Sequence, residues 1–304
     1  MGENKLQESA RIPAGRVNEE NRQHYKEKGF LIAENLFTSR DIEAIKQEAI
    51  SIFKGERGKI EGLIDIKEGA ANEEVLKNYN AIHFPHKISD KIFSYLKDER
   101  VAGILQGIVS ENVKGVQSML FVKAPGKPGQ SWHQDEYFIP SRDRSLTGVW
   151  IAIDDARIDN GCLWVVPGSH KGGFIRRRVK YTGNEYADLE TCELNSYSKK
   201  DEVPVEIKAG SVLFFNGYLL HSSLRNKTKE NYRMALVNHY VSGESYLPWD
   251  PNGDFSKFVM DCRDIVMVAG EDPYAYKGTE DIARVFIRPD VLEPVEKKLH
   301  EREK

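Results

Sequence analysis

The part of the chain from Val116 to Val241 consists of short runs rich in β-branched and aromatic residues, each bounded by a turn signal. These runs are the candidate strands Val116–Val122, Trp132–Tyr137, Thr147–Ile153, Cys162–Val166, Val205–Ile207, Val212–Phe215 and Met234–Val241. Dipeptides that favour tight turns lie between them, at Pro125-Gly126, Asn160-Gly161, Pro167-Gly168, Ala209-Gly210 and Asn216-Gly217. Many short strands with such turns are typical of an antiparallel double sheet or barrel.

Helical patterns precede this β-rich part. Asn21–Lys28 is predicted to be a short helix ended by Gly29, and a strand follows it. Thr38 supplies a capping oxygen for a second helix with apolar residues at helical spacing, and Ser89 opens a third. We therefore expect one domain over residues 1–304, with a flexible start (1–15), a mostly helical buttress (16–115), a double-sheet core (116–241) and a C-terminal extension (242–304).

Net charge and apolar content exclude several classes of protein. The chain has 44 Lys+Arg against 47 Asp+Glu, a net charge of −3, whereas a nucleic-acid binder needs a basic excess to neutralise phosphates. No run approaches the ~20 apolar residues of a membrane span, and the start lacks the apolar core of a signal peptide. Three scattered cysteines imply no disulfide framework. We expect a cytoplasmic protein without a membrane or nucleic-acid partner, and the oligomeric state stays open.

Two histidines and one aspartate form a candidate metal site. His133 and Asp135 lie in one predicted strand, where residues i and i+2 point to the same face. His221 follows a later strand, far enough along the chain to return on a facing strand. Two imidazoles and one carboxylate on one face, with open positions opposite, are the ligand set of non-heme Fe(II) oxygenases. Taken alone, a His-x-Asp motif more often marks a surface pair, so other residues must support the site.

Arg233 and Ser223 give that support. Arg233 opens the strand after His221, and its planar guanidinium is suited to a carboxylate. Ser223 lies two residues after His221 and shares its inward face. These residues suit 2-oxoglutarate, whose keto-acid end chelates iron while its distal carboxylate needs a cation. Two alternatives remain: a cupin-like Zn²⁺ or Mn²⁺ isomerase or hydrolase, which has no use for Arg233 and Ser223, and a non-catalytic ligand-binding protein.

Several segments around these residues resemble the phytanoyl-CoA dioxygenase family of Fe(II)/2-oxoglutarate oxygenases. They are Val116–Met119, Gly148–Ala156, Asn160–Trp164 and Pro167–His170. The resemblance runs from about Val116 to Tyr240. It implies a mainly β (α+β) fold, a double-stranded β-helix or cupin-like jelly roll with N-terminal helices packed against it.

The resemblance also implies roles for single residues. It implies a catalytic iron held by His133, Asp135 and His221. It implies contacts to 2-oxoglutarate from Arg233, Ser223, Trp150 and Met119, and from Lys77 through the pattern Lys77–His83. The implied activity is hydroxylation of an unactivated carbon of a small molecule, with Fe(II), 2-oxoglutarate and O₂. The co-substrate is decarboxylated to succinate, and ascorbate is a candidate reductant.

The substrate is less constrained. The family acts on small molecules that include acyl-CoA esters, so an anionic substrate is one expectation. The basic run Arg176–Arg178 with Lys180 is either a solvated loop or a contact for such an anion. Tyr137 and Phe138 are expected to roof the substrate cavity. Four other histidines are expected to be structural or peripheral: His83, His86, His170 and His239.

Overall fold

The computed structural model of the chain describes residues 10–13, 17–58, 60–67, 69–194, 196–246, 265–281 and 283–289. The helices are α2 Glu19–Lys28, α3 Ser39–Phe53, α4 Asn72–Leu76, α5 Asp90–Leu96 and α6 Glu99–Ile108, with 3-10 turns η1 Pro85–Lys87, η2 Asp135–Tyr137, η3 Ser169–Gly172, η4 Lys199–Asp201 and η6 Ala275–Lys277. The strands are β1 Arg11–Pro13, β2 Phe30–Glu34, β3 Tyr79–His83, β4 Val113–Lys123, β5 Gln130–His133, β6 Thr147–Ala152, β7 Leu163–Val165, β8 Arg178–Lys180, β9 Glu190–Cys192, β10 Val203–Val205, β11 Val212–Asn216, β12 His221–Ser223, β13 Arg233–Ser242, β14 Val266–Ala269 and β15 Phe286–Pro289.

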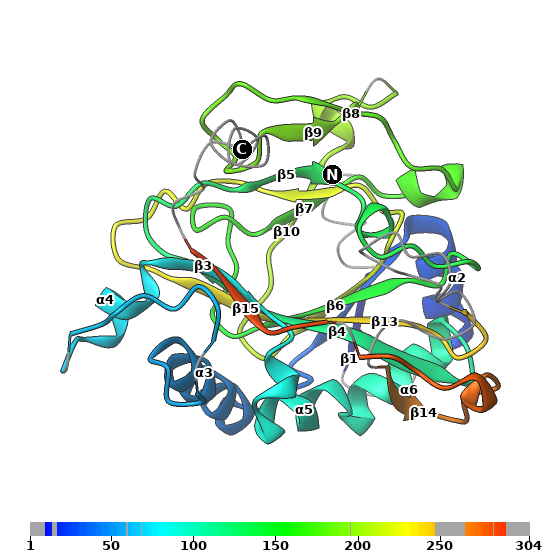
Figure 1. Cartoon of the computed structure of the whole chain (residues 1–304). Helices are drawn as coiled ribbons and strands as arrows, with labels where there is room; N and C mark the ends of the chain where they lie inside the picture. Colours follow the sequence, from blue (N-terminus) through cyan, green and yellow to red (C-terminus); the bar gives the residue numbers. More distant parts are fainter. Residues whose placement is uncertain are drawn as a thin grey trace, which may run out of the picture.

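Two facing sheets form the jelly roll. The larger sheet has nine strands in the order β1-β2-β11-β6-β13-β4-β3-β15, with β14 paired to β4 beside this path. The smaller sheet has four strands in the order β10-β7-β12-β5. In Figure 1 the smaller sheet lies above the larger one, with the β8–β9 hairpin above it and α3, α5 and α6 below the larger sheet. The expected cupin-like jelly roll with helices packed outside is confirmed.

Strand β6 shows why the larger sheet sits between two cores. All six of its residues are buried, and successive side chains point to opposite faces. Val149 and Ile151 pack into the core that the sheet shares with the helices, where Ile45 also lies. Trp150 and Ala152 pack into the core between the two sheets. The inner face of the larger sheet therefore presents its alternate residues to the space between the sheets.

The helix boundaries follow the capping residues. Gly29 ends α2 in the left-handed region at φ 84°, and the side chain of Thr38 accepts a hydrogen bond at the start of α3. The helical stretch that Ser89 opens is present but is not one continuous helix. It is divided into α5 and α6, because Asp98 caps a new helix by accepting from the backbone N–H of Arg100.

Segments outside 116–241 also contribute strands to the larger sheet. Residues 11–13, expected to be flexible, pair with β2 as a parallel strand. Strand β3 lies within the stretch expected to be helical and pairs with β4. Strand β15, from the expected C-terminal extension, pairs with β3. The edge of the larger sheet formed by β3 and β15 is therefore built from segments whose sequence carries no strong strand pattern.

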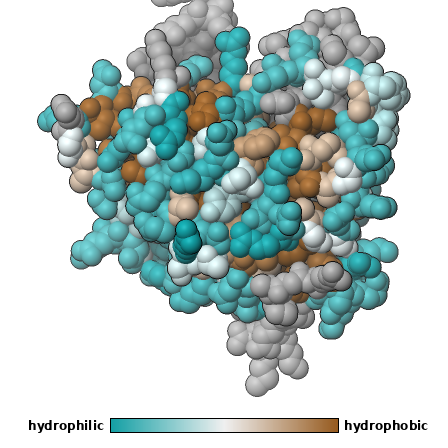
Figure 2. All heavy atoms as spheres, turned by 90° about the horizontal axis from the view of Figure 1, so that it is seen from below, coloured by the Kyte–Doolittle hydropathy of each residue, from teal (hydrophilic) through white to brown (hydrophobic). Residues whose placement is uncertain are grey.

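The helix-covered face is largely hydrophilic. Seen from below in Figure 2, hydrophilic residues cover most of it, and hydrophobic atoms show in scattered places between them. Phe93 on α5 is one of the exposed apolar residues, with 37% of its surface accessible. Among the described residues, no helix is long and apolar enough to cross a membrane.

Gly129 is a packing constraint at the entry to β5. A Cβ added at this glycine would lie 1.8 Å from the carbonyl oxygen of Ser223, which is backbone and has no rotamer to change. We expect Gly129→Ala to lower the free energy of unfolding by about 1–3 kcal/mol through overpacking. Gly103→Ala on α6, where the added methyl meets no atom within 4 Å, is the control and should raise stability by about 0.4–1 kcal/mol. Denaturant unfolding of both variants measures this, and equal effects would contradict the expectation.

Candidate metal centre and co-substrate pocket

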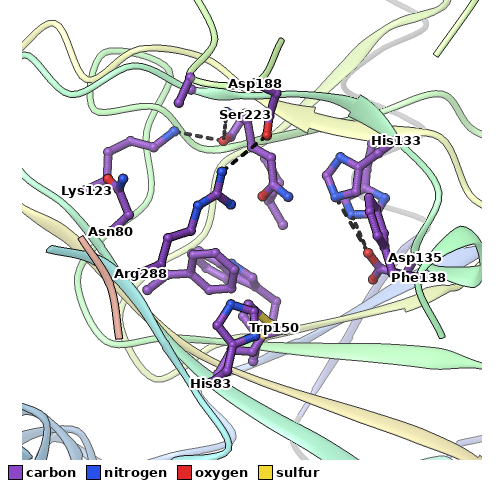
Figure 3. Close-up of a pocket in the computed structure, with 18 of the residues that line it drawn as sticks. Asn80, His83, Lys123, His133, Asp135, Phe138, Trp150, Asp188, Ser223 and Arg288 are labelled. Carbon is purple, nitrogen blue, oxygen red and sulfur yellow. Dashed lines mark hydrogen bonds and ion pairs between the residues drawn. The ribbon is translucent and has the colours of Figure 1, made fainter. Parts of the chain in front are cut away.

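His133, Asp135 and His221 converge in one cavity, and Figure 3 shows His133 and Asp135 side by side on its wall. His133 ends β5 and lies directly opposite His221, the first residue of β12. Nε2 of His133 is 3.6 Å and Nε2 of His221 is 3.5 Å from Oδ1 of Asp135. The three donor atoms lie within 4.8 Å of one another. Two imidazoles and one carboxylate in this arrangement fit the three protein ligands of a non-heme Fe(II) centre.

Asp135 reaches this position through a turn and not through a strand. The predicted strand Trp132–Tyr137 is wrong beyond His133, where β5 ends and the 3-10 turn η2 begins. The carbonyl oxygen of Asp135 accepts hydrogen bonds from the backbone N–H groups of Phe138 and Ile139, at 2.9 and 3.0 Å. These bonds fix the turn, and the turn directs the carboxylate at the two imidazoles.

Backbone carbonyls hold both histidine rings in one orientation. Nδ1 of His133 lies 2.6 Å from the carbonyl oxygen of Ser131, and Nδ1 of His221 lies 2.9 Å from that of Leu219. A carbonyl only accepts, so each Nδ1 must carry the proton and donate it. Each Nε2 is left with its lone pair facing Asp135, which is the form that binds a metal ion.

The charge state of the cluster also suits a cation. Burial, and then the neighbouring His133, lower the pKa of His221 to about 4, so its imidazole is neutral near pH 7. Burial alone would raise the pKa of the Asp135 carboxyl. The interactions with the His221 and His239 rings, including a hydrogen bond from His239, outweigh burial and hold that pKa below its usual range. The neutral imidazole of His221 and the charged carboxylate of Asp135 therefore face the same point as the His133 ring.

His239 contacts one of the metal ligands, and the sequence did not predict this contact. Its Nε2 lies 3.0 Å from Oδ2 of Asp135, the oxygen that does not face the two histidines. His239 was expected on a sheet face, and it lies on the inner face of β13, in register with Gly148 of β6. Alternation from Arg233 through Val237 to His239 is the signal that places this imidazole beside the metal ligands.

We expect His239→Phe to lower Fe(II) affinity by about tenfold to a hundredfold, because loss of an outer partner of a metal ligand has this effect. His239→Gln retains a side-chain N–H donor and should lose less. Competition between the protein and a chelator for Fe(II) measures both variants. Equal Fe(II) affinity of wild type and His239→Phe would show that this hydrogen bond does not support the ligand.

Two buried cations lie side by side farther along the same cavity. Lys123 on β4 and Arg233 on β13 are opposite each other in the strand ladder. Nζ of Lys123 donates to Oγ of Ser223 at 2.8 Å and to the carbonyl oxygen of Leu224 at 2.6 Å. The guanidinium of Arg233 lies 5.5 Å from the ring centre of Trp150. Its buried Nε has no hydrogen-bond partner among the described residues.

This pair of cations calls for an anion. Burial, and then the charge of Arg233, hold the pKa of Lys123 well below its usual range. Burial lowers the pKa of Arg233 to about 10. A carboxylate bound between them would favour both charged forms and use the unpaired donor of Arg233. The distal carboxylate of 2-oxoglutarate fits this position.

The strand register brings the other residues expected to contact 2-oxoglutarate to the same part of the cavity. Val237 on β13 is opposite Met119 on β4 and opposite Trp150 on β6. Met119 and Trp150 therefore flank one inward-facing row, and both line the cavity. Ser223, at the end of β12, faces them from the smaller sheet. The structure thus brings four of the five expected co-substrate residues together.

Lys77 is the exception among these five residues, because the structure does not bring it to the cavity. It is an exposed residue that caps the end of α4 and does not line the cavity. Asn80, three residues later on β3, lines it instead. The cation that the prediction lacks is Lys123, which directly follows the predicted strand Val116–Val122 and is the last residue of β4. It gives no signal in the sequence, because a single lysine at such a position usually faces solvent.

The cavity itself has a volume of about 390 Å³ and holds both the metal ligands and the cation pair. Phe138 lines it, with its ring centre 6.2 Å from that of His133, whereas Tyr137 is 51% exposed and lies outside the lining. His83 also lines the cavity and stacks on Phe286 at 4.3 Å. Of the basic run, Arg178 alone lines the cavity.

His86 and His170 lie outside the cavity lining. Nδ1 of His86 is 2.6 Å from Oγ of Ser118, and Nε2 of His170 is 3.1 Å from the carbonyl oxygen of Lys26. His170 lies in the turn η3, at the corner expected from the Pro-Gly-Ser sequence before it. Both rings therefore make structural contacts.

Comparison with known proteins agrees with the fold. Residues 25–235 match the model of the phytanoyl-CoA dioxygenase (PhyH) family. A phytanoyl-CoA dioxygenase of Arabidopsis thaliana is 40% identical over 130 residues, 42% of this chain and 44% of that protein. Phytanoyl-CoA dioxygenase 1 of Oryza sativa subsp. japonica is 29% identical over 225 residues, 71% of this chain and 76% of that protein.

A solved structure has the same fold. It is the non-heme alpha ketoglutarate dependent carbocyclase SnoK from nogalamycin biosynthesis, with a TM-score of 0.60 and 21% identity over 81% of this chain and 92% of that one. The match of the family model covers more than half of the chain and contains His133, Asp135, His221 and Arg233. The chain therefore belongs to the phytanoyl-CoA dioxygenase family.

Proposed function

We propose that the protein hydroxylates an unactivated carbon of a small molecule in a reaction that consumes 2-oxoglutarate and O₂ and requires Fe(II). One observation carries this proposal. A cluster of two histidines and one carboxylate shares one cavity with a buried pair of cations that has no carboxylate partner among the described residues. The cluster alone would suit several metals. The cation pair adds the requirement for a second, anionic ligand beside the metal.

The residues divide the work of binding. His133, Asp135 and His221 would hold Fe(II) and leave its remaining positions open. Bound Fe(II) and 2-oxoglutarate together supply the activation of O₂, with decarboxylation of 2-oxoglutarate to succinate. Arg233, Lys123 and Ser223 would hold the distal carboxylate by charge-assisted hydrogen bonds, while Trp150 and Met119 flank the carbon chain. The protein's task is to orient these groups and to exclude water.

Hydroxylation is the reaction that this environment favours. The rings nearest the ligands are those of Phe138, and of Phe215 at 4.6 Å from His221. Apolar walls next to the three ligands would suit replacement of a C–H bond by a C–O bond, a change that needs no acid or base from the protein. An isomerase or hydrolase with Zn²⁺ or Mn²⁺ has no use for the cation pair.

Formation of succinate and incorporation of oxygen test the proposal. The protein would be incubated with Fe(II), 2-oxoglutarate, ascorbate and ¹⁸O₂ in the presence of a panel of small molecules. We expect at least one member to stimulate succinate release and to gain one ¹⁸O atom, with no release by His133→Ala. Background succinate with every member, or a converted product without ¹⁸O, would contradict hydroxylation.

A further inference from the structure

Positive charge remains in the cavity after iron and 2-oxoglutarate are accounted for. Among the described residues, five lysines and arginines and two carboxylates line it: Lys123, Lys127, Arg178, Arg233, Arg288, Asp135 and Asp188. The proposed function uses Asp135 for iron and the pair Lys123 and Arg233 for the co-substrate. Arg178 is paired with Glu190, which lies outside the lining, so Asp188 is the remaining lining carboxylate, and a negatively charged substrate would add a second counter-charge beside Arg288.

Arg288 is the cation most available to such a substrate. It lies on β15, the strand at the edge of the larger sheet, and Figure 3 shows its side chain extending into the cavity toward Asp188. One terminal nitrogen of its guanidinium lies 3.7 Å from Oδ1 of Asp188. This distance is short enough for an ion pair but too long for a hydrogen bond. It is the one interaction of the Arg288 side chain within the described part of the chain.

Asp188 links Arg288 to β5, the strand that ends at His133. Oδ2 of Asp188 accepts a hydrogen bond of 2.7 Å from the backbone N–H of Ser131, and Ser131 lies two residues before His133 on β5. The guanidinium is therefore held close to the strand that supplies an iron ligand. Because Asp188 is fixed by this backbone bond, it orients Arg288 without using all of its donors.

Arg178 is engaged more fully. Its Nε donates to Oε2 of Glu190 at 3.0 Å, and its guanidinium packs on the rings of Tyr137 and Phe138 at 5.1 and 5.4 Å. These contacts fix Arg178 as part of the cavity wall. Arg288, with a single long ion pair, is the better candidate to exchange a protein carboxylate for one on a substrate.

The size of the cavity limits the kind of anion. A volume of about 390 Å³ lies near the lower end of the roughly 300–1,000 Å³ of ligand pockets, and 2-oxoglutarate must share it. A small molecule fits this space, whereas the bulk of a coenzyme A ester would remain outside. A single negative charge also suits the position, because a dianion such as a phosphate monoester would meet the charge of Asp188.

We propose that Arg288 is a specificity-determining residue that binds the carboxylate of a small monocarboxylate substrate. This inference rests on the proposed function, because it assigns the substrate class of the same site. The planar guanidinium matches a carboxylate in geometry, and two hydrogen bonds would orient the substrate with its carbon chain toward the iron.

Binding of matched acids and amides tests the proposal. Straight-chain carboxylates of about four to ten carbons, a length scaled to a pocket of this class, would be titrated into protein loaded with Fe(II) and 2-oxoglutarate without oxygen. Their primary amides, equal in shape but neutral, are the controls. We expect at least one acid to bind at least about tenfold more tightly than its amide, because hydrogen bonds to charged groups contribute that much.

Two variants separate substrate binding from a structural role. Arg288→Gln should weaken binding of the acid by about tenfold to a hundredfold. Asp188→Asn should strengthen it, because it frees the guanidinium. If the ion pair served only to hold β15, the two variants would have the same effect. Arg177→Gln is the matched control: Arg177 precedes the cavity residue Arg178, does not line the cavity itself and has 80% of its side chain exposed, so the variant should bind the acid as wild type does.

Three results would overturn the inference: no acid in the panel binds, acids and amides bind equally, or Arg288→Gln binds the acid as tightly as wild type. Binding of 2-oxoglutarate is measured on the same samples before the acid is added. Its absence in wild type would contradict the proposed function. Its presence without any preference for the acid would contradict only the role of Arg288.

Discussion

Asp135→Asn is expected to abolish Fe(II)-dependent formation of succinate and to weaken Fe(II) binding by more than about a hundredfold. Loss of an outer partner of a metal ligand already costs up to that amount, and this substitution removes the charge of a ligand itself. The amide oxygen still accepts the hydrogen bond from His239, whose Nε2 lies 3.0 Å from Oδ2 of Asp135. The fold should therefore be retained.

Fe(II) competition and succinate release measure this effect, with thermal unfolding of the metal-free protein as the check on folding. His170→Gln is the matched control, because His170 contacts the carbonyl of Lys26 and does not line the cavity. Normal succinate release by Asp135→Asn would show that this carboxylate does not hold the catalytic metal.

Arg233→Gln is expected to raise the KM for 2-oxoglutarate with a smaller change in kcat. Removing one partner of a buried, hydrogen-bonded ion pair costs about 2–5 kcal/mol, which corresponds to a loss of affinity of roughly thirtyfold to several thousandfold. Lys123 remains as a cation at the site, 2.8 Å from Oγ of Ser223. Some binding at high 2-oxoglutarate concentration should therefore persist.

Steady-state kinetics with varied 2-oxoglutarate measure this effect, and Arg177→Gln again serves as the control for the loss of one arginine. A co-substrate without a distal carboxylate, such as pyruvate, should lose its disadvantage in Arg233→Gln. An unchanged KM for 2-oxoglutarate in that variant would place the distal carboxylate elsewhere in the cavity.

The sequence predicted much of the fold because its strand and turn signals are local. Gly29 ends a helix and Thr38 begins one wherever tertiary contacts allow it, and both do so here. Strands β3 and β15 were missed because they are short and exist through pairing with each other and with β4. Such pairing joins residues far apart in the chain, which no local pattern records.

The site was predictable where strand alternation or a motif fixed a residue, and less so elsewhere. His133, His221 and Arg233 lie where their strands place them. Asp135 lies in the right place for a different reason, since a 3-10 turn and not a strand carries it. Lys77 lies on the end of a helix, outside the cavity. Arg288, which we propose to bind the substrate, comes from a segment outside the family resemblance that the sequence showed.

Anaerobic titration of 2-oxoglutarate into the wild-type protein with Fe(II) is the most direct test of the whole account. A chelate of an Fe(II) ion and a 2-oxo acid absorbs visible light, so the signal reports both ligands at one site. We expect a saturable absorbance that requires Fe(II) and 2-oxoglutarate together and is lost in Asp135→Asn. Binding of Fe(II) without a change in absorbance on addition of 2-oxoglutarate would contradict the proposed function. It would favour an enzyme that uses another metal ion.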